Sequence, residues 1–201
     1  MRVPGREFYR RLLDSGNVLF LCHRNADPDA IGSAFSLAEA AGGRVGAVDT
    51  LNRAAEAVVR HLDIKVILKP AVEDYDLVVV VDASAGAQIN DLQPRRFAFI
   101  DHHASIPLAD RAEFYLHDDS ARSSSEMVYR LLKEEGIYVT GRMATALLAG
   151  ILTDTANFKF ASSGTLLTAA ELMDISGAGL DDVYSILSSV PADASMRIAV
   201  L

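Results

Sequence analysis

Six side chains of the kinds that bind metals recur along the chain, and each follows an apolar run. They are two histidines and four aspartates: His23, Asp27, Asp29, Asp82, His102 and Asp154. A divalent metal centre needs such a set, because carboxylates and imidazoles neutralise the ions and fix their geometry while other coordination positions stay open to water and substrate. The residue types therefore predict metal-assisted hydrolytic chemistry.

The first candidate ligands share one loop. Asp27 and Asp29 stand four and six residues after His23, so a loop could fold all three around neighbouring ions. Asp29 could also cap the next helix, whose first-turn amides favour negative charge. Because Asp-Pro-Asp is ordinary turn chemistry, a simple turn and cap explains the two carboxylates about as well when they are considered alone.

Asp82 directly follows the apolar run Leu77–Val81. A carboxylate at the end of so apolar a strand is costly unless it is paired, hydrogen-bonded or bound to a metal. A solvated aspartate at the start of a loop, with Ser84 capping the next segment of the chain, is the simpler alternative. As a metal ligand, Asp82 could bridge two ions.

The triplet Asp101-His102-His103 directly follows the run Phe97–Ile100. One imidazole can bind a metal while the neighbouring carboxylate orients a ring through its other nitrogen, and the second histidine can face a substrate phosphate. A plain loop could also contain two adjacent histidines. Asp-His-His at the end of a strand is nevertheless far more specific than a lone histidine.

The sequence around Asp154 and around two further histidines indicates a metal ligand less strongly. Asp154 ends an apolar helical stretch, where the helix dipole disfavours negative charge and a metal would compensate for it. A simple aspartate between helix and loop, paired with Lys159 or with solvent, explains this position slightly better when it is considered alone. His61 and His117 lack a comparable setting, and we predict that they lie on the surface.

Length, composition and charge limit the class of protein. A chain of 201 residues suits one domain, and its apolar stretches are far shorter than the roughly 20 residues that cross a bilayer. The N-terminus shows no signal peptide and the single Cys22 suits a reducing compartment, so we expect a cytoplasmic protein without membrane association. The net charge of −8 argues against long nucleic acid but allows small phosphorylated substrates.

Short β-branched or aromatic runs alternate with longer helical patterns, which is typical of an α/β fold with a mainly parallel sheet and helices on both faces. Strands are expected at Val18–Cys22, Arg44–Val48, Lys65–Leu68, Leu77–Val81, Phe97–Ile100 and Glu113–Leu116. Helices are expected at Ala30–Ala41, Asn52–Leu62, Ser123–Glu135, Arg142–Thr153, Thr165–Ile175 and Leu180–Ser188. Because ligand sites in such sheets lie at the carboxyl ends of the strands, His23, Asp82 and Asp101 should meet at one edge.

Together the four segments resemble the DHH phosphoesterases, which include RecJ-type exonucleases, nanoRNase/pAp phosphatases, cyclic-dinucleotide phosphodiesterases and family II inorganic pyrophosphatases. The resemblance runs from about Val18 to Val190 and implies a catalytic DHH domain over residues 1–190, with residues 191–201 starting a linker or C-terminal tail. Members usually carry a second, C-terminal substrate-binding domain with a glycine-rich, His-containing motif, which this sequence lacks. The chain could therefore be a fragment, a natural short form or a domain that borrows a partner.

The resemblance also implies roles for individual residues. Two divalent ions, usually Mn²⁺, would be bound by the six ligands, with Asp82 as the bridge. His103 would contact the scissile phosphate, and Asp101 would support catalysis from behind the ligands. Arg122 and Ser124 lie in a serine-rich turn before a helix and would meet the substrate phosphate, although an ordinary helix cap explains this turn equally well.

The expected activity is Mn²⁺-dependent hydrolysis of a short single-stranded oligonucleotide or of a small nucleotide such as adenosine 3′,5′-bisphosphate (pAp). A cyclic dinucleotide and inorganic pyrophosphate are rival substrates. A non-catalytic interaction module of a replication or repair assembly is the alternative from another class, but all six ligand positions are filled here. A homodimer is compatible with the sequence.

Overall fold

A computed structural model of the chain describes residues 1–189, so the predicted linker or tail at residues 191–201 lies outside the described residues. None of the described helices is long and apolar enough to span a membrane. The elements follow in the order α1 (Gly5–Leu13), β1 (Val18–Cys22), α2 (Pro28–Ala41), β2 (Arg44–Ala47), α3 (Arg53–His61), β3 (Val66–Leu68), η1 (Val72–Asp74), β4 (Leu77–Val81), η2 (Gly86–Ile89), β5 (Phe97–Asp101), η3 (Pro107–Asp110), β6 (Phe114–His117), α4 (Ser124–Glu134), α5 (Gly141–Asp154), α6 (Ser163–Ser176) and α7 (Leu180–Ser188).

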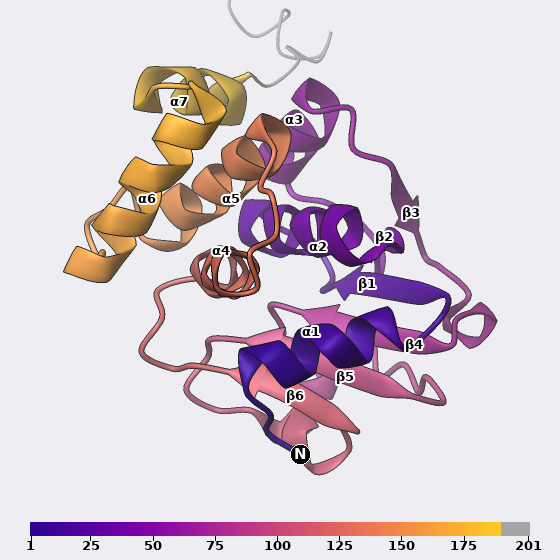
Figure 1. Ribbon diagram of the computed structural model, residues 1–201. Helices are drawn as coiled ribbons and strands as arrows, with labels where there is room; N and C mark the ends of the chain where they lie inside the picture. The colour runs from indigo at the N-terminus through magenta and orange to yellow at the C-terminus, as the bar shows by residue number, and fades with distance from the viewer. Residues whose placement is uncertain (190–201) are drawn as a thin grey trace, which may run out of the picture.

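The strands form one parallel sheet in the order β3-β2-β1-β4-β5-β6 (Figure 1). The chain builds outwards in one direction up to β3 and in the other from β4, so the strand order reverses between β1 and β4. Ligands of open α/β sheets bind outside the carboxyl ends of the strands at such a switch point. In register, Cys22 pairs with Val81, and Val81 pairs with Ile100. The next residues of the three central strands therefore emerge side by side at one edge.

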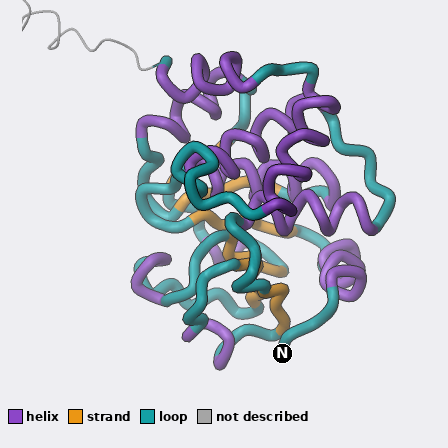
Figure 2. Tube along the Cα trace, turned by 90° about the vertical axis from the view of Figure 1, so that its left-hand side faces the viewer, coloured by secondary structure: helices purple, strands orange, loops and turns teal. Residues whose placement is uncertain are grey.

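Alternate strand residues face two different layers, because side chains alternate across a sheet. Phe20 and Val79 face the larger core, to which all seven described α-helices contribute, whereas Leu21 and Val80 face a smaller core closed by the 3₁₀ helices η1, η2 and η3. The helices are gathered on one side of the sheet in Figures 1 and 2. The predicted α/β class and parallel sheet are confirmed, and helices cover both faces, with the long helices on one of them.

The N-terminal helix α1 is the α-helix that the sequence pattern did not predict. Its residues Phe8, Tyr9 and Leu12 are buried, and Phe8 packs edge-on against Phe114 of β6 with ring centroids 5.5 Å apart. The spacing of these apolar residues is helical, and three of the neighbouring residues are arginines. The segment therefore carries the amphipathic pattern of a surface helix, which is the signal in the sequence for α1.

Two glycines allow α5 to pack very closely against α2 and α4. A Cβ atom on Gly32 of α2 would lie 2.4 Å from the carbonyl oxygen of Ala146. A Cβ atom on Gly150 of α5 would lie 2.2 Å from the Ser125 hydroxyl and 2.8 Å from a carboxylate oxygen of Asp29. Only hydrogen fits at these positions, and the close approach places the C-terminal end of α5 at the carboxyl edge of the sheet.

Candidate metal centre

A cluster of histidines and aspartates lies at the carboxyl ends of β1, β4 and β5. His23 directly follows β1, Asp82 directly follows β4, and His102 directly follows β5. Asp82 is 3% exposed and adopts a left-handed backbone conformation with a φ of 56°. Such a conformation is uncommon in residues other than glycine, although aspartate tolerates it better than most. The turn aims the Asp82 carboxylate back between the ends of β1 and β5.

His23, Asp27 and Asp82 form the first triad of donors, whose ligand atoms lie within 4.8 Å of one another. The Nε2 atom of His23 lies 3.8 Å from Asp27 Oδ2 and 3.7 Å from Asp82 Oδ2. The other ring nitrogen, Nδ1, lies 2.8 Å from the carbonyl oxygen of Arg24. A proton on Nδ1 donates to that carbonyl, and the lone pair of a neutral ring then faces the two carboxylates, as in metal-binding histidines.

Asp29, His102 and Asp154 form the second triad, with the same 4.8 Å limit between ligand atoms. The Nε2 atom of His102 lies 3.0 Å from Asp154 Oδ2 and 3.4 Å from Asp82 Oδ1. Asp82 therefore turns one oxygen towards His23 of the first triad and the other towards His102 of the second. Asp154 pairs with His102 and not with Lys159, which was the simple alternative for this residue.

The first turn of α4 holds two of the carboxylates in place. The backbone amides of Ser124 and Ser125 donate to the two oxygens of Asp29 at 2.7 and 2.8 Å, and the Ser124 hydroxyl donates to Asp82 Oδ1 at 3.0 Å. Ser124 is completely buried. Its hydroxyl and its amide are thus both used to orient carboxylates, and the predicted contact of Ser124 with the substrate stays a prediction.

Asp27, and not Asp29, caps helix α2. Asp27 Oδ1 accepts a hydrogen bond from the backbone amide of Ala30 at 3.0 Å, and Pro28 occupies the first helical position, where its missing N–H costs nothing. The expectation that Asp29 could cap this helix is wrong, because the Asp29 side chain turns towards α4. Asp27 combines both interpretations, since one oxygen caps the helix and the other faces His23.

His103 is held by two contacts of different kinds. Its Nδ1 atom lies 2.6 Å from Asp101 Oδ1, and its backbone carbonyl accepts a hydrogen bond of 2.7 Å from Nε2 of His117. Asp101 is completely buried, so it positions His103 and does not reach a substrate itself. The prediction that His117 lies on the surface is wrong. His117 ends the last strand and pairs in register with Asp101, and this position at the end of a strand is the feature that indicates its burial near the site.

The electrostatics of the cluster favour added positive charge. Burial lowers the pKa of His23 and His102, but the nearby carboxylates of Asp27 and Asp82 raise that of His23 to about 10, and those of Asp154 and Asp82 raise that of His102 to about 11. Burial and the neighbouring charge of Asp82 raise the pKa of Asp29. No lysine or arginine among residues 1–189 forms an ion pair with a carboxylate of either triad. The donor set therefore fits divalent cations.

An open hollow of about 300 Å³ adjoins the second triad. His102, His103 and Asp154 form one part of its wall, and Arg122 and Phe160 form another. Arg122, which we predicted as a substrate contact, is thus exposed beside the donors. A phosphate placed in this hollow would lie next to both histidines.

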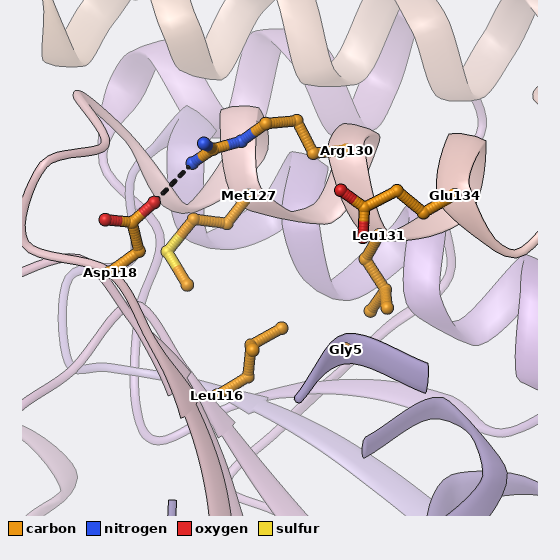
Figure 3. Close-up of a pocket in the computed structure, with 7 residues that line it drawn as sticks. All are labelled: Gly5, Leu116, Asp118, Met127, Arg130, Leu131 and Glu134. Atoms are coloured by element: carbon orange, nitrogen blue, oxygen red, sulfur yellow. Dashed lines mark hydrogen bonds and ion pairs between the residues drawn. The ribbon is translucent and has the colours of Figure 1, made fainter. Parts of the chain in front are cut away.

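A different hollow, shown in Figure 3, lies between α1, β6 and α4. Leu116, Met127 and Leu131 point into it, and an ion pair of 2.8 Å between Asp118 and Arg130 closes one side. Three apolar side chains thus fill its wall, and Glu134 is the other charged residue that lines it. The chemistry of the molecule therefore concentrates at the carboxyl edge of the sheet.

Comparison with known protein families gives a match over most of this fold. The family model described as the N-terminal domain of the DHH family matches residues 17–151. That range contains both triads except Asp154, together with Asp101, His103 and the first turn of α4.

Comparison with individual proteins gives relatives that are longer than this chain. An uncharacterized protein of Methanocaldococcus jannaschii is 31% identical in an alignment 199 residues long, which covers 93% of this chain and 59% of the relative. A protein of Streptococcus agalactiae serotype III, named a probable manganese-dependent inorganic pyrophosphatase, is 28% identical in an alignment 178 residues long, which covers 82% of this chain and 57% of the relative. The chain thus spans a little more than half the length of these proteins.

Two solved structures share the fold. An exopolyphosphatase-related protein from Bacteroides fragilis superimposes with a TM-score of 0.79 at 20% identity, over 96% of this chain and 63% of that one. CDC45 from Entamoeba histolytica superimposes with a TM-score of 0.53 at 16% identity, over 87% of this chain and 38% of that one. At these identities the likeness concerns the fold alone.

Proposed function

Because the chain belongs to the DHH family, we propose that it is the catalytic domain of a metal-dependent phosphohydrolase that acts on phosphoesters of small nucleotides or short oligonucleotides. The observation that carries this proposal is the position of Asp82. Its two oxygens face two separate donor triads, and each triad contains one histidine and further aspartates. That is the arrangement expected of residues that share a bridging carboxylate between two cations.

The donors divide naturally between two divalent ions. His23, Asp27 and Asp82 would hold one ion, and Asp29, His102 and Asp154, together with Asp82, would hold the other. Manganese is the metal in the name of the streptococcal relative, and we propose it for this chain. Such ions, when bound, lower the pKa of bound water and offset the negative charge of phosphate oxygens.

His103 and Arg122 are the groups that we propose for substrate contact. Asp101 binds Nδ1 of His103 and raises the pKa of that imidazole, which leaves Nε2 to donate a hydrogen bond to a phosphate oxygen. Arg122 lines the same hollow, and a guanidinium suits the recognition of phosphate oxygens. His103 would therefore hold a proton where negative charge develops, while Arg122 orients the phosphate.

Hydrolysis of inorganic pyrophosphate is the second candidate function. It is favoured by the name of the streptococcal relative at 28% identity. A purely non-catalytic role is less well supported, because both triads keep a full set of donors. These side chains do not favour a mechanism of phosphoryl transfer without metal ions.

A substrate panel tests the proposed function. Hydrolysis of pAp, a dinucleotide, cyclic di-AMP and pyrophosphate would be compared with Mn²⁺ present and after its removal. The Asp82→Asn variant should lose bound metal, and its turnover should fall at least roughly 100-fold, because the bridging charge is removed. Asp174→Asn, an exposed change on α6, is the matched control and should behave like the unmodified protein.

Two results would contradict the proposal. One is an unmodified protein that binds Mn²⁺ but hydrolyses no member of the panel. The other is an Asp82→Asn variant that keeps full metal content and full activity. Hydrolysis of pyrophosphate alone would replace the nucleotide proposal with the second candidate.

A further inference from the structure

Phe160 is an exposed aromatic side chain in the wall of an otherwise polar hollow. It is 59% exposed, and it lines the hollow together with His102, His103 and Arg122. Inorganic phosphates have no apolar surface that could cover such a ring. Nothing in the proposed chemistry so far uses this side chain.

An unusual backbone turn sets the position of Phe160. Ala156, Asn157 and Phe158 follow one another in the left-handed region, with φ angles of 48°, 59° and 66°. Left-handed conformations normally occur as single residues, because Cβ approaches the following carbonyl oxygen. Three in succession without a glycine form a strained segment, and such segments cluster at functional sites.

The strained turn is held by hydrogen bonds to the end of α5. The buried Thr155 hydroxyl accepts from the amide of Phe158 at 3.0 Å, and the Thr155 carbonyl accepts from the amide of Phe160 at 3.0 Å. The amide of Asn157 donates to the Leu152 carbonyl at 2.8 Å, and Phe158 packs against the main core. These contacts fix the turn directly after Asp154, so the Phe160 ring has a defined place beside the donors.

A cation also lies near the ring. The ammonium nitrogen of Lys159 lies 5.4 Å from the centre of the Phe160 ring, within the range of a cation–π contact. Arg122 lines the same hollow, as does Asp119. An apolar ring thus shares a hollow with an arginine and two histidines, which matches a molecule that carries a flat base close to a phosphate.

We propose that Phe160 stacks against the nucleobase of a nucleotide whose phosphate lies beside His103 and Arg122. This inference rests on the proposed function and specifies its substrate class, because it favours nucleotides over pyrophosphate. Stacking of a base on an aromatic side chain typically changes affinity by about tenfold or more on removal of the ring. The contact is tolerant of base identity, since every base offers a flat face.

A binding experiment tests the stacking directly. The chain contains no tryptophan, so Phe160→Trp introduces a single fluorescent reporter at the proposed contact. Adenosine monophosphate, titrated at constant Mn²⁺, should quench this reporter, and ribose 5-phosphate, which lacks the base, should not. Tyr138→Trp is the control. Tyr138 is 84% exposed and lies before the N-terminal end of α5, about 20 Å along that helix from Asp154.

Kinetics provides the second readout. Phe160→Ala should lower kcat/KM for pAp about tenfold and leave hydrolysis of pyrophosphate unchanged, whereas Phe160→Tyr, which keeps the ring, should retain the activity on pAp. An equal loss on both substrates would assign Phe160 to structure and overturn the inference. Equal quenching by ribose 5-phosphate, or no quenching by adenosine monophosphate, would also overturn it. Failure of the proposed function is a separate outcome, in which no substrate is hydrolysed although the binding titration still reports on the ring.

Discussion

At the scale of single residues, two adjacent histidines have different surroundings and different proposed roles. His102 and His103 are adjacent, yet His102 Nε2 faces Asp154 and Asp82, whereas His103 Nδ1 is bound to Asp101. His102 is thus surrounded by carboxylates of both triads. His103 is 43% exposed and lies on the side of the hollow.

Replacing His102 and replacing His103 by alanine should therefore change different properties of the protein. His102→Ala should lose metal, because it deletes a donor of the second triad. His103→Ala should keep its metal, and its kcat should fall on the order of 100-fold, which is the usual decrease when a proton donor is removed. Metal content and steady-state kinetics of the purified variants measure this. His61→Ala, exposed on α3, is the control, and equal metal loss in both variants would refute the division of roles.

At the scale of elements, the site depends on how closely α2, α4 and α5 pack. Asp29 comes from α2, the amides that hold it come from α4, and Asp154 comes from the end of α5. Gly150 lies where these three helices meet. Any side chain there would push the Ser125 hydroxyl and the Asp29 carboxylate aside.

Gly150→Ala should therefore damage both stability and metal binding. A Cβ atom 2.2 Å from Ser125 Oγ forces backbone or side-chain shifts, which cost about 1–3 kcal/mol of folding free energy. Urea unfolding and Mn²⁺ titration measure the two effects. Gly164→Ala in α6 is the matched control, because a Cβ atom there would meet nothing closer than 3.6 Å. This substitution should stabilise the helix by up to about 1 kcal/mol. Unchanged metal affinity in Gly150→Ala would show that Asp29 tolerates the displacement.

At the scale of the whole molecule, negative charge is concentrated at one edge of the sheet. The chain has a net charge of −8, and its two triads contribute four carboxylates without a lysine or arginine partner within residues 1–189. In the metal-free protein the two histidines supply the compensating protons. Their pKa values of about 10 and about 11 lie well above the ordinary value of 6.5.

Metal binding at pH 7 should consequently release protons. Both imidazoles carry a proton at that pH, and a metal ligand must be a neutral ring, so His23 and His102 together should release about two protons. The apparent affinity for Mn²⁺ should then rise with pH up to about 11, where both imidazoles have lost their protons without the metal. Calorimetry in buffers with different ionisation enthalpies counts the protons. A pH-independent affinity without proton release would contradict the charge state described here.

Much of the site could be predicted because of how parallel sheets are built. Buried strands are continuous apolar runs, and a polar residue that ends such a run marks the carboxyl edge of the sheet. His23, Asp82 and Asp101 were recognised in this way, and the predicted bounds of the central strands agree with the structure to within one residue. Local sequence was sufficient for these features, since they depend on alternation and burial along a single segment.

Contacts between distant segments were decided only by the tertiary structure. The order in which β1 lies beside β4 brings His23 within 3.7 Å of Asp82, although the two residues are far apart in sequence. The packing of α4 brings the Ser124 hydroxyl to Asp82, a contact that no local pattern in the sequence indicates. The strained turn after α5 places Phe160 beside the donors, because hydrogen bonds and core packing hold Ala156 and Phe158 in a conformation that such residues rarely adopt.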